Sequence, residues 1–437
     1  MFQRLPSYRD VSPTTFWNSD VPSHWSVAPG LAVIEENKRR NTDLAEGRVL
    51  SLSYGRVVVK PVEKQRGLVP ESYEGYQVLE PGDIVIRPTD LQNDQTSIRV
   101  GMVRDRGIIT SAYIGLRPKG SWSADYAYAY LATVDSTKRI YGMGSGLRQQ
   151  LGWDDLKRMP CLVPPPEEQA HIVKYLTHAN ARIDKAIAAK RRLIALVNEE
   201  KQAVARDLLS SGSGEIGRVP GHWQSVISKR LCRITTGVED SGNSAPDGEY
   251  PFFVRGREIL RSSDYLFDAE AVMTPGDGQG GVGKVFHYYN GKFQAHQRVY
   301  VFLNFKGVRG RYFYWYLSTF FRSYALAQSN TVTMESLRQP VLASFPIAFP
   351  SMREQLRLVE QIEAETSRMQ NRVDVAQREI ALLGEFRARL VADVVTGQAD
   401  VRAIAASLPE IDPDSPTPDP LADGDQIVED AMEMSEV

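Results

Sequence analysis

The chain is poor in cysteine, and several other common patterns are missing from it. Its 437 residues include two cysteines, Cys161 and Cys232, and neither has a partner at metal-ligand spacing. A disulfide framework and a zinc site are therefore not expected, and a reducing, cytoplasmic setting is favoured. No apolar run approaches the ~18 residues that a membrane span needs. Residues 1–10 have no apolar core of the signal-peptide type.

The sequence also lacks the patterns of a catalytic site. The six histidines do not fall at metal-ligand spacing, no GxSxG turn is present, and the Asn/Asp-Pro-Pro-Tyr motif of amino-methyltransferases is missing. The segment Gly278–Lys284 does satisfy the GxxxxGK spacing of a phosphate-binding loop. However, Val285 stands where such loops have Ser or Thr, and a strand is predicted where they have a helix. A simple turn and a close approach to a DNA backbone are the alternatives to nucleotide binding.

Charge is distributed unevenly along the chain. The net charge is −2, but residues 403–437 contain ten Asp/Glu and no Lys/Arg, so the rest of the chain carries about +8. Residues 401–437 are therefore predicted to be an acidic, disordered tail. Residues 1–160 and 219–346 are mildly basic, which permits a polyanionic partner without requiring one.

The strongest signal is an internal repeat. Val21–Trp25 (Val-Pro-Ser-His-Trp) returns as Val219–Trp223 (Val-Pro-Gly-His-Trp). Each copy later reaches a proline-rich stretch that ends in a Glu-Gln pair, Glu168-Gln169 and Glu354-Gln355, 186 residues apart. The same offset aligns Arg182 with Arg368, Ile194 with Ile380, Leu196 with Leu382 and Glu199 with Glu385. Such an ordered series indicates a duplication.

A long helix is predicted after each Glu-Gln pair. Apolar residues recur at spacings of three, four or seven over 172–204 and 362–394, with charged residues between them, which is the pattern of a heptad seam. Gly212 and Gly397 mark the expected C-terminal ends, so each helix would have about 40–45 residues. The seam needs a partner. Either the two helices pack together, antiparallel or side by side, or each packs on its own globular segment.

The globular segments are predicted to be mixed, with strands dominant. The fold class is therefore α+β: two mixed α/β domains joined by two long helices, with an internal repeat. Predicted strands are Val49–Val59, Ile84–Arg87, Ile108–Leu116, Ala271–Thr274, Lys284–Tyr289 and Arg298–Leu303, and predicted short helices are Asp125–Ala132 and Arg311–Leu326. The domains are residues 1–163, the helix 164–212, residues 213–348, the helix 349–400 and the tail 401–437.

Both globular segments contain residue types that read base edges, because Arg can pair with guanine and Asn or Gln with adenine. Ordinary solvated loops have the same composition, so both interpretations stay open. The candidates are Gln92, Asn93, Gln95, Arg99, Arg104 and Arg106 in the first segment, and Arg255, Arg257, Gln279, Lys284, Gln297 and Arg298 in the second.

Taken in order, these features resemble the specificity subunit of type I restriction–modification systems. The residues that carry the resemblance are the two His-Trp openings, the two Glu-Gln pairs, Arg182-Ile183-Asp184 and the Ser-Gly and Thr-Gly helix ends at Gly212 and Gly397. The resemblance extends to about residue 400. The second copy departs from it at Met369-Gln370, and the acidic tail lies outside it.

The resemblance implies a non-catalytic DNA-recognition subunit. Each globular segment would be a target recognition domain for one half of a bipartite sequence, and two antiparallel coiled-coil helices would set the distance between them. Two copies of a modification (methyltransferase) subunit would dock on the frame, with Glu168, Gln169, Glu354 and Gln355 as candidate docking residues. Restriction subunits would join them, and these partners would use S-adenosylmethionine, ATP and Mg²⁺. A coiled-coil protein adaptor and a nucleotide-dependent enzyme using Gly278–Lys284 remain the alternatives.

Overall fold

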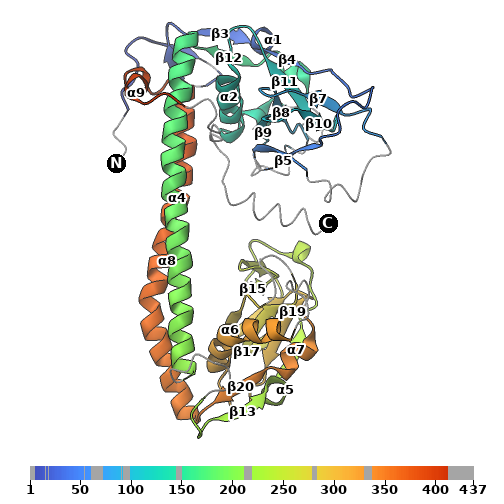
Figure 1. Cartoon of the computed structure of the whole chain (residues 1–437), viewed down its shortest axis with the longest axis vertical. Helices are drawn as coiled ribbons and strands as arrows, with labels where there is room; N and C mark the ends of the chain where they lie inside the picture. The colour runs from blue at the N-terminus through green and yellow to red at the C-terminus, as the bar shows by residue number, and fades with distance from the viewer. Residues whose placement is uncertain are drawn as a thin grey trace. The chain divides into compact units, whose positions relative to one another are not determined.

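The chain consists of two compact units. A computed structural model describes residues 5–14, 16–17, 19–53, 55–60, 72–89, 91, 99–143, 150–210, 219–277, 283–328 and 337–411. Unit 1 comprises Met1–Lys190 and Arg378–Val437, and unit 2 comprises Arg191–Gln377. Each unit contains a globular part and about half of each long helix, α4 (Pro166–Leu209) and α8 (Met352–Val395), which Figure 1 shows in green and orange.

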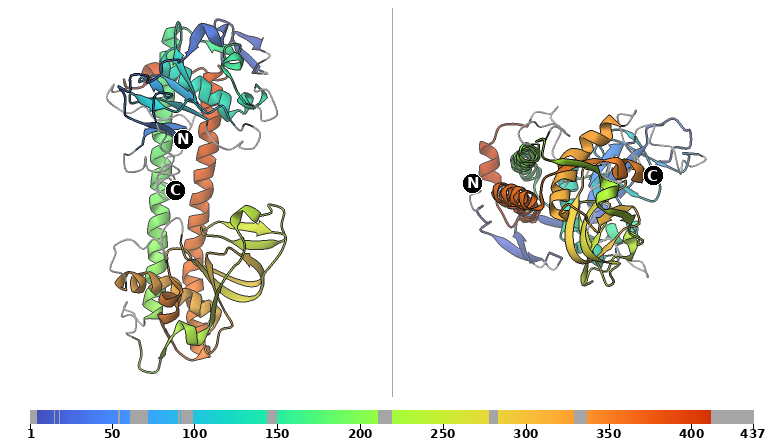
Figure 2. Two further views of the ribbon diagram at one scale, coloured as in Figure 1. Left: turned by 90° about the vertical axis from the view of Figure 1, so that its right-hand side faces the viewer. Right: turned by 90° about the horizontal axis from the view of Figure 1, so that it is seen from below.

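The two long helices have 44 residues each, within the predicted length. In unit 1, Ile172 and Ile183 near the start of α4 share a core with Val391 near the end of α8. In unit 2 the relation is inverted, because Leu209 at the end of α4 shares a core with Leu358 near the start of α8. The helices are therefore antiparallel in both units, as their ribbons show (Figure 2). Among the described residues, no helix is long and apolar enough to cross a bilayer.

Unit 1 has a six-stranded sheet in the order β4-β11-β8-β9-β6-β5. Its neighbours are antiparallel except β6 and β9, which run parallel. The strands are β4 (Ile34–Glu36), β5 (Leu50–Ser53), β6 (Arg56–Val59), β8 (Ile84–Ile86), β9 (Val100–Met102) and β11 (Ile114–Pro118). Shorter ladders pair β1 (Val11–Thr14) with β2 (Ser19–Pro22), β7 (Gln77–Leu79) with β10 (Gly107–Ile109), and β3 (Ser26–Pro29) with β12 (Pro160–Val163).

Unit 2 has a six-stranded sheet in the order β14-β19-β17-β18-β15-β16. Here β15 and β18 form the parallel pair. The strands are β14 (Arg233–Thr236), β15 (Tyr250–Phe253), β16 (Ile259–Ser262), β17 (Phe267–Pro275), β18 (His287–Ala295) and β19 (Val299–Leu303). A separate ladder pairs β13 (Gln224–Ile227) with β20 (Pro346–Phe349), matching the β3–β12 ladder of unit 1.

One helix packs against each sheet. Their bounds, Ala124–Ser136 for α2 and Gly310–Ala327 for α6, include both predicted short helices. The remaining helical segments are α1 (Gly30–Val33), η2 (Arg139–Gly142), α3 (Trp153–Leu156), α5 (Ser228–Leu231), η3 (Ser241–Asn243), α7 (Gln339–Ser344) and α9 (Arg402–Ser407). The predicted strand Ile108–Leu116 is wrong at its centre, because a turn with a Tyr113 N to Thr110 O hydrogen bond (3.2 Å) separates β10 from β11.

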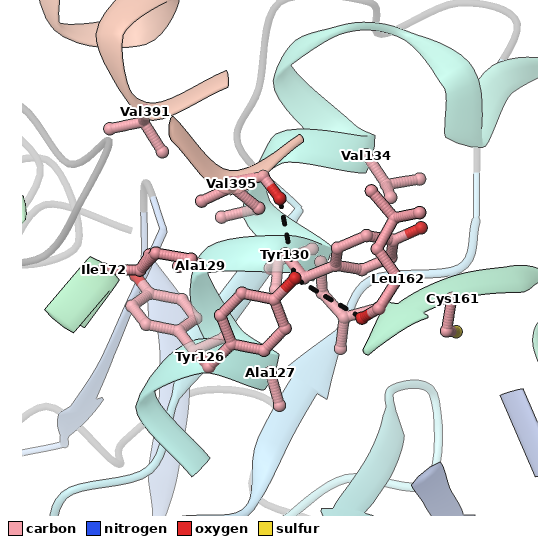
Figure 3. Packing of buried hydrophobic residues seen from close by; sticks show 14 of the residues in the cluster. Tyr126, Ala127, Ala129, Tyr130, Val134, Cys161, Leu162, Ile172, Val391 and Val395 are labelled. Atoms are coloured by element: carbon pink, nitrogen blue, oxygen red, sulfur yellow. Dashed lines mark hydrogen bonds between the residues drawn. The ribbon is translucent and has the colours of Figure 1, made fainter. Parts of the chain in front are cut away.

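Aromatic residues of α2 join the globular part of unit 1 to its helix pair. Tyr126 is fully buried, and its hydroxyl donates to Leu162 O (3.3 Å) and Val395 O (3.5 Å), on β12 and the end of α8 (Figure 3). Ile172 of α4 lies in the same cluster. Unit 2 uses Tyr312 of α6 in the matching way, since its hydroxyl donates to Ala348 O at 2.8 Å. The seam of α4 and α8 is thus covered both by the opposite helix and by the globular parts.

The segment after α8 is folded as far as residue 411. Gly397 has a φ of 74° and ends the helix, and a Cβ added there would lie 2.3 Å from Cδ of Pro22. Val401 and Ala405 of the following segment are buried in unit 1. The prediction of a disordered tail is therefore wrong for residues 401–411, because two apolar side chains anchor this stretch. Residues 412–437 lie outside the described residues, as does Gly212.

Candidate functional site

The two repeated motifs of each copy meet in space. In unit 1, Nε2 of His24 lies 2.7 Å from a carboxylate oxygen of Glu168. In unit 2, Nε2 of His222 lies 3.2 Å from a carboxylate oxygen of Glu354. The His-Trp opening of each globular segment is thereby tied to the first turn of a long helix, and we call this contact the joint. The repeat predicted both motifs, but not that they touch.

The glutamine of each Glu-Gln pair completes the joint. Gln169 accepts a hydrogen bond from Ser123 N (2.9 Å) and donates to Ser121 O (2.6 Å) and Pro164 O (2.9 Å). Gln355 makes the same three bonds, to Arg309 N (2.9 Å), Gly307 O (3.2 Å) and Pro350 O (2.9 Å). Each glutamine thus connects the start of its sheet-packing helix, α2 or α6, to the start of a long helix. The amide oxygen and both amide N–H groups of each glutamine therefore have hydrogen-bond partners, as buried polar groups require.

These contacts change the role assigned to three of the four predicted docking residues. Gln169 and Gln355 are 1% and 0% exposed, and Glu168 is 4% exposed. Side chains so deeply buried cannot reach a partner protein, so the assignment of these three to docking is corrected to a role in the joint. Glu354 retains 26% side-chain exposure and remains a candidate.

A second group of interest is a cluster of loops in unit 2. It comprises residues 237–240 after β14, the β15–β16 loop 254–258, residues 276–277 after β17 and the β18–β19 turn 296–298, and we call it the loop cluster. Backbone bonds join its members: His296 N to Phe253 O (2.9 Å), Gln297 N to Glu239 O (2.9 Å) and Gly276 N to Arg298 O (2.8 Å). The close approach requires glycine at 237, where a Cβ would lie 1.8 Å from Ala295 O.

His296 sits at the centre of the loop cluster and is 2% exposed. Its Nδ1 accepts a hydrogen bond from Arg298 N at 3.0 Å, and its Nε2 lies 3.8 Å from a carboxylate oxygen of Asp240. Burial lowers the pKa of His296, and the positive charge of Arg255 lowers it further. Burial also lowers the pKa of His287, whose Nε2 lies 3.1 Å from Gly256 O. His296 therefore stabilises the β18–β19 turn and His287 the β15–β16 loop, each through a hydrogen bond to the backbone.

Four of the six predicted reading residues of unit 2 project from this cluster. Arg255, Arg257, Gln297 and Arg298 are all exposed. Arg298 pairs with Asp277 at 2.6 Å, which orients its guanidinium group. Lys284 is exposed but lies elsewhere, since its neighbour Gly283 packs beside Arg322 and Phe321 of α6. The structure thus brings together residues from separate loops that the sequence placed only by composition.

In unit 1 the predicted base-reading residues Arg104 and Arg106 lie close to carboxylates of the same unit. Arg104 and Arg106 are exposed on the loop between β9 and β10. Arg104 lies 3.8 Å from Asp125, while Arg106 pairs with Glu46 (3.1 Å) and Glu80 (3.3 Å). A nucleic acid that used these guanidinium groups would have to compete with these carboxylates.

The prediction that Arg99 reads a base is wrong. Its side chain is fully buried, with Nη1 donating to Thr89 O (2.5 Å) and Nε to the Tyr141 hydroxyl (3.3 Å). Its backbone N–H donates to Asp135 of α2 at 2.6 Å. Arg99 therefore holds the start of β9 inside the core and cannot read a base. Composition could not reveal this, because burial of an arginine depends on acceptors distant in sequence.

The remaining candidates, Gln92, Asn93, Gln95 and Gln279, lie outside the described residues. Residues 278–282 of the glycine-rich segment are also outside them. The next regular element along the chain is the strand β18, which begins at His287. The predicted strand, Lys284–Tyr289, is confirmed only from His287 onward. A phosphate-binding loop would need a helix there to aim its N-terminus at the phosphates.

Comparisons with known proteins agree with this organisation. Residues 220–369 match the family model of the type I restriction modification DNA specificity domain. The specificity subunit of the type I restriction enzyme EcoDI from Escherichia coli is 25% identical over 182 residues, 42% of this chain and 40% of that protein. In this match the chain thus spans 40% of the length of its curated relative.

One solved structure supports the fold. A structure from work on complex assembly and conformational transition of the type I R-M system superposes with a TM-score of 0.51 at 14% identity, over 86% of this chain and 99% of that one. The S subunit of the type I system of M. genitalium covers 85% of this chain and 96% of its own at 12% identity, with a TM-score of 0.38.

The repeated joints and antiparallel helices define a duplicated chain in which each sheet domain is attached to one long-helix pair. Residues 220–369, which contain the loop cluster, match a DNA specificity domain of type I restriction–modification systems, and the curated relative is a specificity subunit of such a system. The resemblance inferred from the repeat is confirmed.

Proposed function

We propose that this chain recognises a bipartite DNA sequence on behalf of a type I methyltransferase or restriction enzyme. The observation that carries the proposal is the loop cluster of unit 2. It lies inside the segment matched to a DNA specificity domain, and it presents Arg255, Arg257, Gln297 and Arg298 to solvent. Arginine pairs with guanine O6/N7 and glutamine with adenine N6/N7 in the major groove.

The chemistry of the cluster suits readout more than simple attraction. Arg298 is held by Asp277, so its free edge is oriented before DNA arrives. Asp240 and Glu239 stand beside the same turn, and carboxylates accept hydrogen bonds from cytosine N4 but repel phosphate. A mixed set of donors and acceptors on braced loops discriminates bases, whereas a purely basic patch would bind any duplex.

Catalysis would belong to partner subunits. We infer that two modification subunits dock on the frame formed by α4, α8 and the joints, and that restriction subunits join them. S-adenosylmethionine, ATP and Mg²⁺ would be used by those subunits and not by this chain. A cytoplasmic location is part of the same proposal, because that is where the DNA is.

The decisive test compares two double substitutions within unit 2 that each remove two positive charges. Arg255→Gln/Arg257→Gln removes two exposed guanidinium groups from the loop cluster. The matched control Lys229→Gln/Arg230→Gln removes the same charge from the exposed face of α5. The complex of this chain with its modification subunit would be used to select duplexes from a random pool, and binding measured by fluorescence anisotropy.

We expect the loop-cluster variant to lose about 30-fold or more in affinity, since two good arginine–base pairs at ~1–3 kcal/mol each amount to about 2–6 kcal/mol of discrimination. Selected duplexes should lose sequence information in one half-site only. The control should weaken binding to all duplexes alike and by much less. Equal losses in the two variants would show that the cluster supplies charge and no readout.

A further inference from the structure

One face of α4 has no role in the joint or the seam. His171, Lys174, His178, Arg182 and Lys185 follow one another at spacings of three or four. At 3.6 residues per turn they fall within an arc of about 80°. Ile172, Leu176 and Ile183 of the buried seam lie on the opposite side of the helix. We call this face the basic stripe.

Opposing charge is scarce on this part of α4. Between residues 169 and 192 the helix has one acidic residue, Asp184, and its carboxylate is paired with Arg387 of α8. The same stretch has Lys190, Arg191 and Arg192 in addition to the stripe. Lys190 is paired with Glu379 of α8, but α4 itself has a large excess of positive charge over this stretch, which favours a polyanionic occupant.

The chain itself already touches the stripe. A carboxylate oxygen of Glu410 lies 2.6 Å from Nζ of Lys174, and the carbonyl of Pro409 lies 2.9 Å from Nε2 of His178. Lys174, through its hydrogen bond and its charge, lowers the pKa of the Glu410 carboxyl, and the charge of His171 contributes in the same direction. The segment after α9 thus reaches the stripe with its first acidic residue.

The second copy of the repeat lacks this surface. Under the 186-residue offset, the stripe positions are occupied by Arg357, Glu360, Ala364, Arg368 and Asn371. The second copy thus has an acidic residue in place of Lys174. It also has no histidine at either histidine position and a neutral residue in place of Lys185. A frame shared by two identical partners has no need of a stripe on one copy only. The acidic segment that meets it also occurs once.

We propose that the acidic residues beyond Ile411 are the occupant of the basic stripe. Residues 412–437 contain nine Asp/Glu and no Lys/Arg. They are tethered one residue beyond the Glu410–Lys174 contact, so their effective concentration at the stripe is in the millimolar range typical of short linkers, about 1 mM or more. A segment of 26 residues can span up to ~85 Å, far more than the ~21 Å from His171 to Lys185.

Several weak contacts act together in this arrangement. Each exposed ion pair contributes little and is screened by salt, so the segment binds cooperatively at low ionic strength and is released at high ionic strength. While bound, it keeps other polyanions, including DNA outside the recognition loops, from the first half of α4. This inference does not depend on the proposed DNA readout.

Carbodiimide cross-linking of the full chain tests the proposal, because this reagent joins an amine to a carboxylate in direct contact. At low salt, carboxylates of residues 412–437 should link mainly to Lys174 and Lys185. Links to Lys38, Lys119 and Lys157 on the globular part of unit 1 should be rare. The selective links should disappear at about 1 M salt, where the Debye length is about 3 Å. Links spread over all lysines, or concentrated on unit 2, would overturn the proposal.

A variant built from the repeat gives an independent measurement. Lys174→Glu/His178→Ala/Lys185→Asn introduces the residues that the second copy has at the matching positions. Cleavage of the acidic segment by an Asp-specific protease should be several-fold faster than in the wild type at low salt, and equal to it at high salt. The control Lys119→Glu/Lys157→Asn should cleave like the wild type. Equal rates in all three proteins would contradict the proposal.

Discussion

The two sheets differ in how their outer hairpin is threaded. In unit 1 the parallel partner of the central strands is β6, the second strand of its hairpin, and β5 forms the edge. In unit 2 the parallel partner is β15, the first strand of its hairpin, and β16 forms the edge. The other four strands have the same order in both, β4-β11-β8-β9 and β14-β19-β17-β18.

The joints, by contrast, are the same in both copies down to individual hydrogen bonds. Gln169 and Gln355 each satisfy one N–H and two carbonyls, and each adjoining carboxylate meets a histidine. The contrast shows where a duplicated chain tolerates change. Outer strands and loops can be rebuilt, whereas the attachment of each domain to its helix is retained.

The largest effect is expected from removing a joint glutamine. Gln355→Ala leaves one buried N–H and two buried carbonyls without a partner, which should cost about 3 kcal/mol or more of the free energy of unfolding. Gln169→Ala should cost about as much, because its contacts are equivalent. Urea denaturation measures both, with the exposed Gln361→Ala on α8 as control. A large cost in one copy and a negligible cost in the other would break the equivalence.

A smaller effect is expected where the helix pair differs between copies. Arg387, whose side chain is 5% exposed, pairs with Asp184 in unit 1. The matching positions in unit 2 are Lys201 and Gln370, which are 2.5 Å apart. Asp184→Asn should cost about 1–2 kcal/mol, because it removes the counter-charge of a buried guanidinium while Asp184 itself is half exposed. Gln370→Ala should cost less than about 0.5 kcal/mol. Similar losses of unfolding free energy for Asp184→Asn and Gln370→Ala, measured by urea denaturation, would contradict this difference between the copies.

The copies should also differ in their response to acid. The pKa of His296 and of His287 is lowered in the folded unit 2, so the unfolded chain binds protons more readily. Stability from the neutral rings is therefore present above the ordinary histidine pKa of ~6.5 and is lost as the pH falls below it. Protonation of His296 would also break its bond from Arg298 N.

Hydrogen exchange at pH 7.5 and 5.5, corrected for intrinsic rates, measures this effect segment by segment. The β18–β19 turn should lose protection at the lower pH, while the β9–β10 loop of unit 1, which has no histidine, should not. His296→Gln should reduce the difference between the two pH values. Loss of protection to the same degree in both units would point to general acid destabilisation.

The smallest effect is expected from making the second copy resemble the first. Gln370→Asp would give Lys201 an acidic partner, as Asp184 does for Arg387. Because such a pair is largely solvated, a gain of at most about 0.5 kcal/mol is expected. A clear destabilisation in thermal unfolding would mean that the two helix halves are not equivalent in register.

Much of the frame could be predicted from the sequence, because its signals are local and periodic. The heptad spacing and the Glu-Gln pairs placed α4 and α8 to within a few residues, and Gly397 marked a true helix end. The order of the strands could not be predicted, since pairing such as β6 with β9 depends on contacts distant in sequence.

The candidate site was only partly predictable for the same reason. Residue type singled out Arg255 and Arg298, but it also singled out Arg99, which is buried. His296 and His287 were missed because they brace the loops and do not project from them. Gly237 was missed as well, and only the distance to Ala295 shows why it must be glycine.

Two diverged domains on one retained frame should read two different half-sites. Methylation-sensitive sequencing of DNA from cells expressing the chain with its modification subunit tests this directly, with the wild type beside Arg255→Gln/Arg257→Gln. We expect a bipartite methylated motif in the wild type. In the variant, one half of that motif should relax, while the other half and the spacer stay unchanged. A single contiguous motif, or equal relaxation of both halves, would contradict the two-reader arrangement.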